Sequence, residues 1–194
     1  NKTMPFGKNN QHVPINLIDF KNFSNNSYVI TNQFKTQGLE SKVPDIVMMI
    51  NGIPVIVGEA KTPIRPSISW LDGAHEIHDI YENSIPELFV PNILSFATEG
   101  KELFYGAVRN SLQFWSPWRI NNNENDLEKK LGLGEIKEEL IDLLSPERLL
   151  DILKNFSLFT TNKKKQRSKV ICRFQQYEGA NKIVQRVIEG KEKK

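Results

Sequence analysis

Two apolar runs separated by an Asn-Gly pair constrain the fold more than any other part of this chain. The first run covers Ile46 to Ile50 and the second covers Ile53 to Val57. An Asn-Gly pair between two such segments predicts a tight β-hairpin. Because neither run alternates with polar residues, both faces of each strand should be buried. The sequence therefore predicts two strands at the centre of a sheet that helices cover on both sides.

Apolar spacing elsewhere predicts the rest of an α/β fold. The other expected strands cover residues 28–34, 93–98 and 104–108, and the expected helices cover 69–84, 135–144, 145–156 and 174–189. Residues 1–26 are polar and Asn-rich, which predicts irregular structure. The expected fold class is α/β, with a mixed central sheet flanked by helices and a helical extension at the C-terminus.

The charge is distributed unevenly along the 194 residues. The net charge is +3, but residues 163–194 carry 11 Lys/Arg and 3 Asp/Glu, whereas the preceding residues carry 15 basic and 20 acidic side chains. This split predicts an acidic body and a basic terminal segment that either contacts phosphate groups or forms a solvated face. We expect a first domain over 1–125, a helical extension over 126–162, and a basic linker with a further helix over 163–194.

Composition also limits the class of protein. A hydrophobic content of 39% is enough for an ordinary core. No apolar run approaches the ~18 residues of a membrane span, and no basic-then-apolar leader is visible, so we expect a soluble, cytoplasmic chain. The single cysteine, Cys172, has no disulfide partner and predicts a half-buried thiol.

Charged side chains frame the two central strands. Asp45 precedes the first run, and Glu59, Ala60 and Lys61 follow the second. Hydrolysis of a phosphodiester requires a cation on the phosphoryl oxygens and a water in line with the leaving group. Oxygen ligands suit Mg²⁺, which keeps several of its waters. We expect Asp45, Glu59 and the Ala60 carbonyl to bind Mg²⁺, while the Lys61 ammonium holds the attacking water or the transition-state charge.

The triplet Glu/Asp-x-Lys is a weak signal by itself, since it occurs eight times in this chain. Only the triplet that begins at Glu59 ends an apolar run whose partner strand begins with Pro-Asp. The alternative is a hairpin that ends in a surface ion pair, which would contribute little stability.

The hairpin register decides between these interpretations. A strict two-residue loop would pair Ile50 with Ile53 and Asp45 with Gly58, which places the Asp45 and Glu59 side chains on opposite faces. A shared metal site therefore requires a register shift of one residue. We expect this shift either in a three-residue loop with a glycine bulge at Gly52 or in a β-bulge near Gly58.

Several segments in order resemble the N-terminal nuclease domain of the R (restriction) subunit of type I restriction enzymes. The matching segments are Asn26 to Gln33, Pro44 to Val47, Asn51 to Pro54, Glu59 to Lys61, Ile85 to Phe89 and Trp118-Arg119. This resemblance implies the PD-(D/E)xK nuclease fold and Mg²⁺-dependent cleavage of double-stranded DNA, with Asp45, Glu59 and Lys61 as catalytic residues. It also implies methylation and specificity subunits as partners.

One position departs from that family. The family usually carries a Gln and a Tyr four residues apart on the helix after the active strands. Here Tyr81 is present, but the residue four positions before it is Ile77. Glu76 or His78 is the expected substitute, although the favoured interpretation of His78 is an ordinary, partly exposed helix histidine.

A second resemblance lies near the C-terminus. Arg173, Phe174 and Gln176 are similar to the adenine-reading Q motif that precedes the phosphate loop of superfamily 2 helicases, which implies ATP binding by a longer protein. The same residues are also typical of the start of an amphipathic helix. No Gly-x-x-x-x-Gly-Lys-Ser/Thr occurs in the chain, so we expect no ATP hydrolysis by that route.

The aromatic segment Phe114 to Trp118 can stack on bases or, as we expect, pack the first domain against the following helices. Two other functions remain open from the sequence. The chain can be a non-catalytic docking module that retains a nuclease fold, or a free-standing repair or resolvase nuclease of the same fold.

Overall fold

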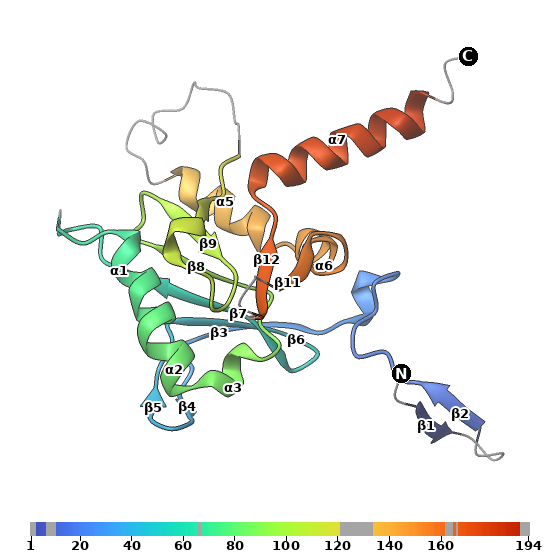
Figure 1. Ribbon diagram of the computed structural model, residues 1–194, viewed down its shortest axis with the longest axis horizontal. Coiled ribbons are helices and arrows are strands. Elements are labelled where there is room, and N and C mark those ends of the chain that lie inside the picture. The colour runs from blue at the N-terminus through green and yellow to red at the C-terminus, as the bar shows by residue number, and fades with distance from the viewer. Residues whose placement is uncertain are drawn as a thin grey trace.

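A mixed sheet forms the centre of the molecule (Figure 1). The computed structural model describes residues 3–6, 11–65, 67–120, 134–161, 165 and 167–190. The six strands lie in the order β10-β9-β8-β7-β6-β3. Their bounds are β3 (Tyr28–Asn32), β6 (Ile46–Ile50), β7 (Ile53–Ala60), β8 (Leu94–Thr98), β9 (Leu103–Gly106) and β10 (Ser116–Pro117). Only β7 and β8 are parallel. The predicted α/β class is confirmed.

A helical segment connects the two parallel strands. It consists of α1 (Trp70–His75), the π-helical turn η2 (Glu76–Tyr81), α2 (Glu82–Ser84) and α3 (Pro86–Phe89). The segment begins where the Ser69 hydroxyl accepts a hydrogen bond from the Leu71 N–H at 3.2 Å, while Asp72 accepts one from the Ser69 N–H at 2.7 Å. The predicted helix therefore begins next to its expected start at Ser69, although its middle is not α-helical.

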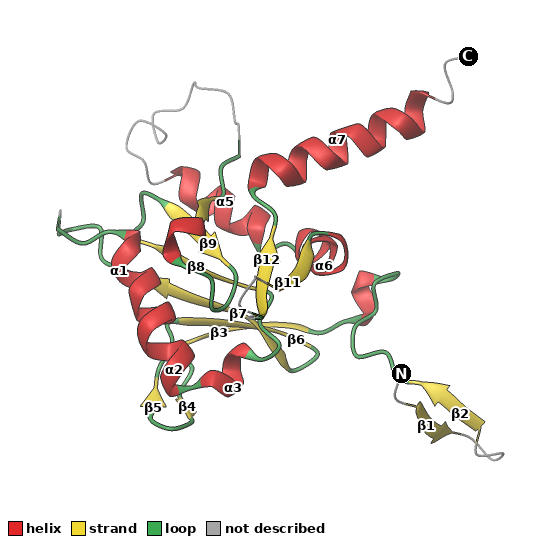
Figure 2. Ribbon diagram, in the orientation of Figure 1, coloured by secondary structure: helices red, strands yellow, loops and turns green. Residues whose placement is uncertain are grey.

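Helices cover the sheet on both faces (Figure 2). Alternate residues of the central strands point to opposite sides, as the pleat requires. Val47 and Val57 pack with Ala74 and Ile77 from the crossover helices. The other face carries a second cluster, which includes Met48, Ile50, Ile56, Phe96, Leu143, Leu149 and Ile152. The prediction that both central strands are buried on both faces is confirmed.

The C-terminal helices pack on the second face. They are α5 (Gly134–Leu143), α6 (Pro146–Asn155) and α7 (Phe174–Gly190), close to their predicted bounds. Trp118 is fully buried at this contact, and its indole Nε1 donates a hydrogen bond to Asp142 at 2.8 Å. Its ring lies 4.9 Å from Phe174 and 5.9 Å from Tyr177. The prediction that the aromatic segment packs the sheet against the later helices is confirmed for Trp118.

Three small hairpins were not predicted, and one of them contradicts an expectation. β1 (Thr3–Phe6) pairs with β2 (Gln11–Pro14), so the prediction of irregular structure over residues 1–26 is wrong there. β4 (Thr36–Gln37) pairs with β5 (Ser41–Lys42), and β11 (Ser157–Thr161) pairs with β12 (Arg167–Ile171). Short 3₁₀ turns occupy Phe23–Asn25 and Leu112–Phe114. These strands have only two to five residues each, so they are too short to show the apolar pattern that predicts a strand.

The central hairpin contains the required register shift, but at neither expected position. Ile50 pairs with Ile53 across a two-residue turn, so the alternative of a three-residue loop is wrong. The register shifts between Met48 and Met49, which pair with Ile56 and Pro54 and leave Val55 as the additional residue. The bulge therefore follows Pro54, whose nitrogen has no hydrogen to donate to a regular ladder, and it is not near Gly58.

Gly58 is required by close packing. A Cβ atom at this position would lie 2.3 Å from Cζ of Phe96, a distance at which the two carbons overlap. The aromatic ring on the neighbouring strand therefore approaches the backbone directly before Glu59.

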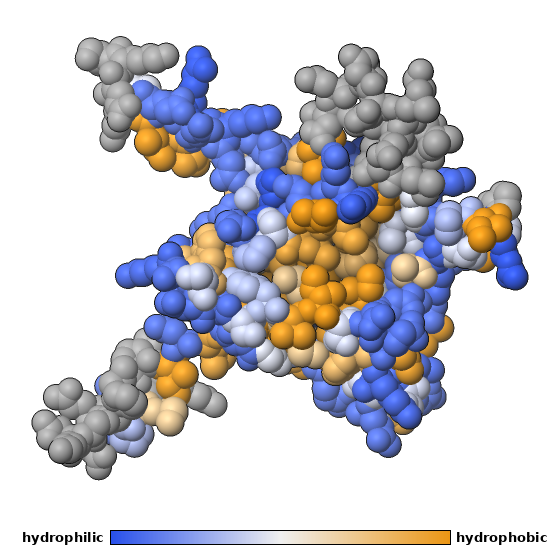
Figure 3. All heavy atoms as spheres, turned by 180° about the vertical axis from the view of Figure 1, so that it is seen from behind, coloured by the Kyte–Doolittle hydropathy of each residue, from blue (hydrophilic) through white to orange (hydrophobic). Residues whose placement is uncertain are grey.

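The surface has two apolar features. Figure 3 shows apolar side chains gathered at the centre of the face opposite to that of Figure 1, surrounded by polar ones. Helix α7 extends away from the sheet (Figure 1), and Ile183, Val184, Val187 and Ile188 on it are 55–67% exposed. Within the described part of the chain, the helices are all too short or too polar to cross a membrane.

Candidate active site

The register shift brings Asp45 and Glu59 to the same face of the sheet. The ladder of the hairpin ends where Ile46 pairs with Gly58, so the next position places Asp45 opposite Glu59. The negative charge of Asp45 contributes to the raised pKa of Glu59, which is consistent with this proximity. The shared face that a two-carboxylate site requires is therefore present.

Asp45 is held by two donors. Its Oδ1 accepts a hydrogen bond from Nε2 of Gln33 at 2.7 Å, and its Oδ2 accepts one from the Ala60 N–H at 3.0 Å. The backbone of Gln33 has a φ of 50°, and its N–H donates to the Asp45 carbonyl at 2.9 Å. Each carboxylate oxygen has two lone pairs, so both can still accept a further partner. The Gln33 amide therefore fixes the orientation of the carboxylate without occupying it fully.

Glu59 is a buried carboxylate at the end of β7. Its residue is 3% exposed, and its Oε1 accepts a hydrogen bond from Nζ of Lys61 at 2.8 Å. Burial raises the pKa of Glu59 to about 7, and the neighbouring carboxylates of Asp45 and Glu76 act in the same direction, while Lys61 opposes them. A cation that faced Asp45 and Glu59 would relieve this repulsion.

Lys61 lies between two carboxylates. Its ammonium forms ion pairs with Glu59 and Glu76, and its backbone N–H donates to the Thr98 carbonyl at 2.8 Å, which extends the pairing of β7 with β8. Burial alone would lower the pKa of Lys61, but the two carboxylates raise it above its usual value. The ammonium is therefore charged at the site.

The helix supplies Glu76 and Tyr81 to the same cluster. The Tyr81 hydroxyl lies 2.9 Å from Oε1 of Glu76 and 3.2 Å from Oε2 of Glu59. Burial alone would raise the pKa of Glu76, but hydrogen bonds from Lys61 and Tyr81 lower it below its usual value. The two glutamates differ because Glu59 is buried, whereas the side chain of Glu76 is 32% exposed. Glu76 is thus the ionised partner of Lys61 in this arrangement.

The π-helical turn explains how Glu76 and Tyr81, five positions apart in the sequence, reach the same cluster. In an α-helix, residues four positions apart share a face, whereas one π turn adds a residue. Glu76 and Tyr81 begin and end the turn η2, so both side chains reach the end of β7. Of the two expected substitutes for the glutamine of the related family, the structure joins Glu76 to the site. His78 lies 2.7 Å from Asp79 instead, on the exposed side, and its supporting role stays a prediction.

The donor set fits a hard divalent cation such as Mg²⁺. Asp45 and Glu59 offer carboxylate oxygens on one face, and Mg²⁺ uses few protein carboxylates while it keeps its waters. Among the described residues, no group of three or more His, Cys, Asp and Glu side chains is placed to hold a metal ion. The structure shows the Ala60 N–H bonded to Asp45. The role of the Ala60 carbonyl as a ligand stays a prediction.

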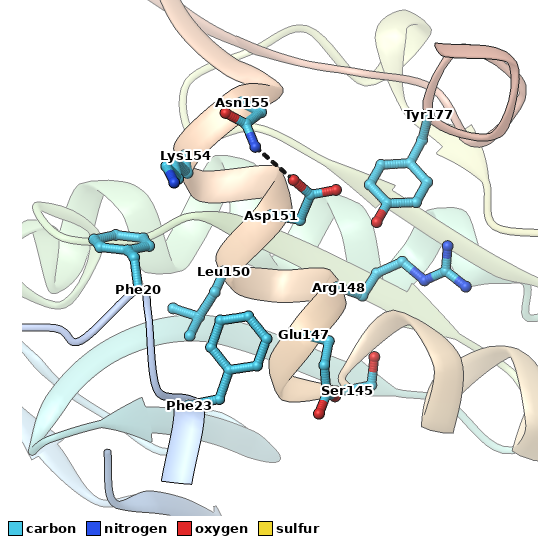
Figure 4. A pocket seen from close by; sticks show the side chains of 10 residues that line it. All are labelled: Phe20, Phe23, Ser145, Glu147, Arg148, Leu150, Asp151, Lys154, Asn155 and Tyr177. Atoms are coloured by element: carbon cyan, nitrogen blue, oxygen red, sulfur yellow. Dashed lines mark hydrogen bonds between the residues drawn. The ribbon is translucent and has the colours of Figure 1, made fainter. Parts of the chain in front are cut away.

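A second candidate cavity lies away from this cluster. Its volume is about 490 Å³, and Figure 4 shows Phe20 and Phe23 on one side of helix α6 and Tyr177 on the other. The guanidinium of Arg148 lies 4.8 Å from the Tyr177 ring and also pairs with Asp142 and Glu178. None of the carboxylate-site residues lines this cavity. It is therefore a junction between helices and is separate from the candidate active site.

The residues that resemble a Q motif form the first turn of α7. Oε1 of Gln176 accepts a hydrogen bond from the Arg173 N–H at 2.9 Å, and Phe174 is buried against Trp118. The first contact is a local one at the start of the helix, and the second packs the helix on the core. Nucleotide binding by Arg173, Phe174 and Gln176 stays a prediction for a longer protein.

Sequence reasoning did not assign a role to Gln33. Its only signal was its place at the end of the segment Asn26 to Gln33, and nothing in the spacing connected it with Asp45. The contact depends on the positive φ of Gln33, which turns its side chain back onto the next strand.

A mixed sheet that carries two carboxylates and a lysine at the end of adjacent strands is a restriction-endonuclease-like fold. The family described as type I restriction enzyme R protein N terminus matches residues 2–114, and the chain belongs to this family.

Three relatives carry the same kind of name. The chain is 30% identical over 90% of its length to the HindI type I restriction enzyme endonuclease subunit of Haemophilus influenzae. It is 33% identical over 89% of its length to the MjaVIIIP endonuclease subunit of Methanocaldococcus jannaschii, and 25% identical over 76% to the EcoprrI endonuclease subunit of Escherichia coli. The chain spans 17%, 16% and 47% of these relatives, respectively.

Proposed function

We propose that this chain is the endonuclease domain of a type I restriction enzyme R subunit and hydrolyses phosphodiester bonds of double-stranded DNA with Mg²⁺. The observation that carries the proposal is the register shift that places Asp45 opposite Glu59, with Lys61 bonded to Glu59. The names of the relatives as endonuclease subunits support it. In the complete enzyme this activity would be coupled to ATP-dependent translocation and to methylation and specificity subunits.

Each side chain of the carboxylate cluster would have a separate role in this reaction. Asp45 and Glu59 would hold Mg²⁺, which when bound offsets charge on the phosphoryl oxygens and lowers the pKa of its waters. Gln33 keeps the Asp45 carboxylate in position. Lys61, which Glu76 and Glu59 orient, presents its ammonium to the developing negative charge. Tyr81 fixes both glutamates through its hydroxyl.

The test compares metal binding and cleavage. Asp45→Asn, Glu59→Gln and Lys61→Met are nearly isosteric, so they remove charge with little change in packing. In the complete enzyme each should lower DNA cleavage at least about a hundredfold, since metal and charge stabilisation contribute several kcal/mol. DNA-stimulated ATP hydrolysis should be unchanged. Glu87→Gln, on the exposed surface of α3, is the matched control.

Calorimetric titration of the chain with Mg²⁺ or Mn²⁺ separates the proposal from a docking module. The proposal expects binding that Asp45→Asn and Glu59→Gln weaken and that Lys61→Met retains. The non-catalytic module would be favoured by two results together. The folded wild-type chain would bind neither ion, and the complete enzyme would still cleave DNA with each of the three substitutions.

A further inference from the structure

A lysine is buried without an acidic partner on the hairpin formed by β11 and β12. Lys169 is 8% exposed, and its ammonium donates one hydrogen bond, to the backbone carbonyl of Asn92 at 2.5 Å. No acidic partner of Lys169 is found in the part of the chain that the structure describes. Burial lowers its pKa to about 8, so the ammonium is still largely charged near neutral pH. A buried cation of this kind costs free energy unless something compensates it.

This lysine lines a cavity of about 250 Å³ between α3 and the hairpin. At ~30 Å³ for each water, the space holds several waters or one small anion. Two further cations line it, Arg109 after β9 and Arg167 on β12. The cavity thus combines three positive side chains from two parts of the chain, the segment after β9 and strand β12.

The arrangement of the two arginines keeps them at the cavity. The guanidinium of Arg167 lies 4.3 Å from the centre of the Phe159 ring, which orients it without neutralising its charge. Arg109 has a φ of 56°, and its backbone N–H donates to Oε2 of Glu82 at 2.9 Å. Arg109 is exposed, and its guanidinium forms no ion pair within the part of the chain that the structure describes.

Glu82 is the one carboxylate that lines the same cavity. It is 6% exposed, and burial raises its pKa to about 7, although the Arg109 N–H acts in the opposite direction. The hydrogen bond from the Arg109 backbone N–H goes to Oε2 of Glu82. Glu82 therefore fixes the Arg109 backbone and does not act as a full counter-ion for Lys169.

We propose that the cavity lined by Arg109, Arg167 and Lys169 binds a phosphate group, either free or as part of a DNA backbone. Arginine forks and a lysine ammonium are the usual donors to phosphate oxygens, and the two unused ammonium hydrogens of Lys169 supply buried donors. Arg167 and Lys169 belong to the basic segment 163–194, so this segment would contribute to a phosphate site that is separate from the carboxylate cluster.

The first experiment uses inorganic phosphate with the 194-residue chain in a buffer without other oxyanions. Phosphate should raise the thermal unfolding midpoint of the wild type, and calorimetric titration should show binding. Lys169→Met should weaken that binding at least about tenfold, the loss of a charged hydrogen bond. It should leave the protein at least as stable without phosphate, because it removes a buried charge. Lys165→Met, an exposed lysine in the same hairpin, is the matched control and should bind phosphate normally.

The second experiment distinguishes the source of the phosphate. If the DNA backbone is the ligand, Lys169→Met weakens the binding of a short DNA duplex without added Mg²⁺ and reduces the slope of log K against log salt concentration by about one. If a free phosphate or nucleotide is the ligand, duplex binding is unchanged while the phosphate effect is lost. Because no cleavage is measured, these results are independent of the proposed nuclease activity.

The proposal is wrong if phosphate neither binds nor stabilises the wild type and duplex binding is equal in all variants. Should Lys169→Met fail to fold, Arg109→Asn replaces it, since asparagine tolerates the positive φ at that position. Undiminished phosphate binding by Arg109→Asn would then overturn the assignment.

Discussion

At the residue scale, the candidate site consists of carboxylates whose neighbours set their orientation and ionisation. Gln33 orients Asp45, while burial and the neighbouring carboxylates of Asp45 and Glu76 raise the pKa of Glu59. The sequence identified Asp45, Glu59 and Lys61 from the context of the strands. The roles of Gln33 and Glu76 required coordinates, because each acts through a contact between residues far apart in the chain or on an irregular helix.

Replacement of Gln33 by Ala should lower the affinity for Mg²⁺ or Mn²⁺ by about 10-fold to 100-fold, the usual effect of losing a partner that orients a metal ligand. Far-UV circular dichroism should be unchanged. Calorimetric titration of the metal is the measurement, and Gln37→Ala on the exposed strand β4 is the control. Equal affinities for the two variants and the wild type would show that Asp45 does not depend on this amide.

Glu82 should make stability fall as the pH rises. Burial raises its pKa from 4.5 to about 7 in the folded state, so the folded protein binds an additional proton between these values. The stability is therefore fully present below about pH 4.5 and is lost as the pH increases through about 7.

Replacement of Glu82 by Gln keeps an acceptor for the Arg109 N–H but cannot ionise. Between pH 5 and pH 8 the wild type should lose on the order of 2 kcal/mol more unfolding free energy than this variant. Urea unfolding at both pH values gives the difference, and Glu87→Gln should behave like the wild type. If the two pH dependences are parallel, Glu82 does not titrate in this range.

At the element scale, two irregularities place the site. The bulge after Pro54 brings Asp45 and Glu59 to one face, and the π turn brings Glu76 and Tyr81 to the same place. Neither could be located from the sequence. The central strands are apolar on both faces, so two registers one residue apart bury similar side chains, and the apolar pattern does not distinguish them.

Deletion of Ile80 tests the π turn. This residue is 44% exposed, and its removal would convert the π turn into a regular α-helix in which Tyr81 follows Glu76 by four positions instead of five. Both side chains would then still share a face. We expect an unfolding free energy within about 1 kcal/mol of the wild type and retained metal binding.

The control for that deletion is the removal of Glu138 from the regular helix α5, which would rotate its apolar face away from the sheet. It should cost more than about 3 kcal/mol, because buried leucines such as Leu143 lose their contacts. Circular dichroism with urea unfolding measures both. If both deletions lowered the unfolding free energy equally, the additional residue in η2 would be required for the stability of the helix.

At the scale of the whole molecule, one core joins the sheet to the C-terminal helices. Phe96 and Tyr105 of the sheet share a cluster with Leu149 of α6 and Phe174 of α7. The predicted boundary near residue 125 lies outside the described residues. The packing indicates that the segments before and after it stabilise each other, since removal of α6 and α7 would expose this cluster.

A chain cut after residue 125 should therefore be unfolded or aggregated, whereas the intact chain should unfold in one transition. Scanning calorimetry and circular dichroism are the measurements. Removal of residues 1–14 is the control, because the hairpin of β1 and β2 projects away from the sheet (Figure 1) and should contribute little. A cut chain that melts at the temperature of the intact one would show that the helical extension is an independent unit.

The sequence by itself determined the class of fold and three of the side chains at the candidate site. Continuous apolar runs, an Asn-Gly turn and the charged residues that frame the runs are local signals, and they led to the central strands and to Asp45, Glu59 and Lys61. The tertiary structure alone decided the register, the contacts of Glu76 with Lys61 and Tyr81, and the burial of Lys169 in a basic cavity. These features depend on pairing and packing between distant segments, whose energies a local pattern does not contain.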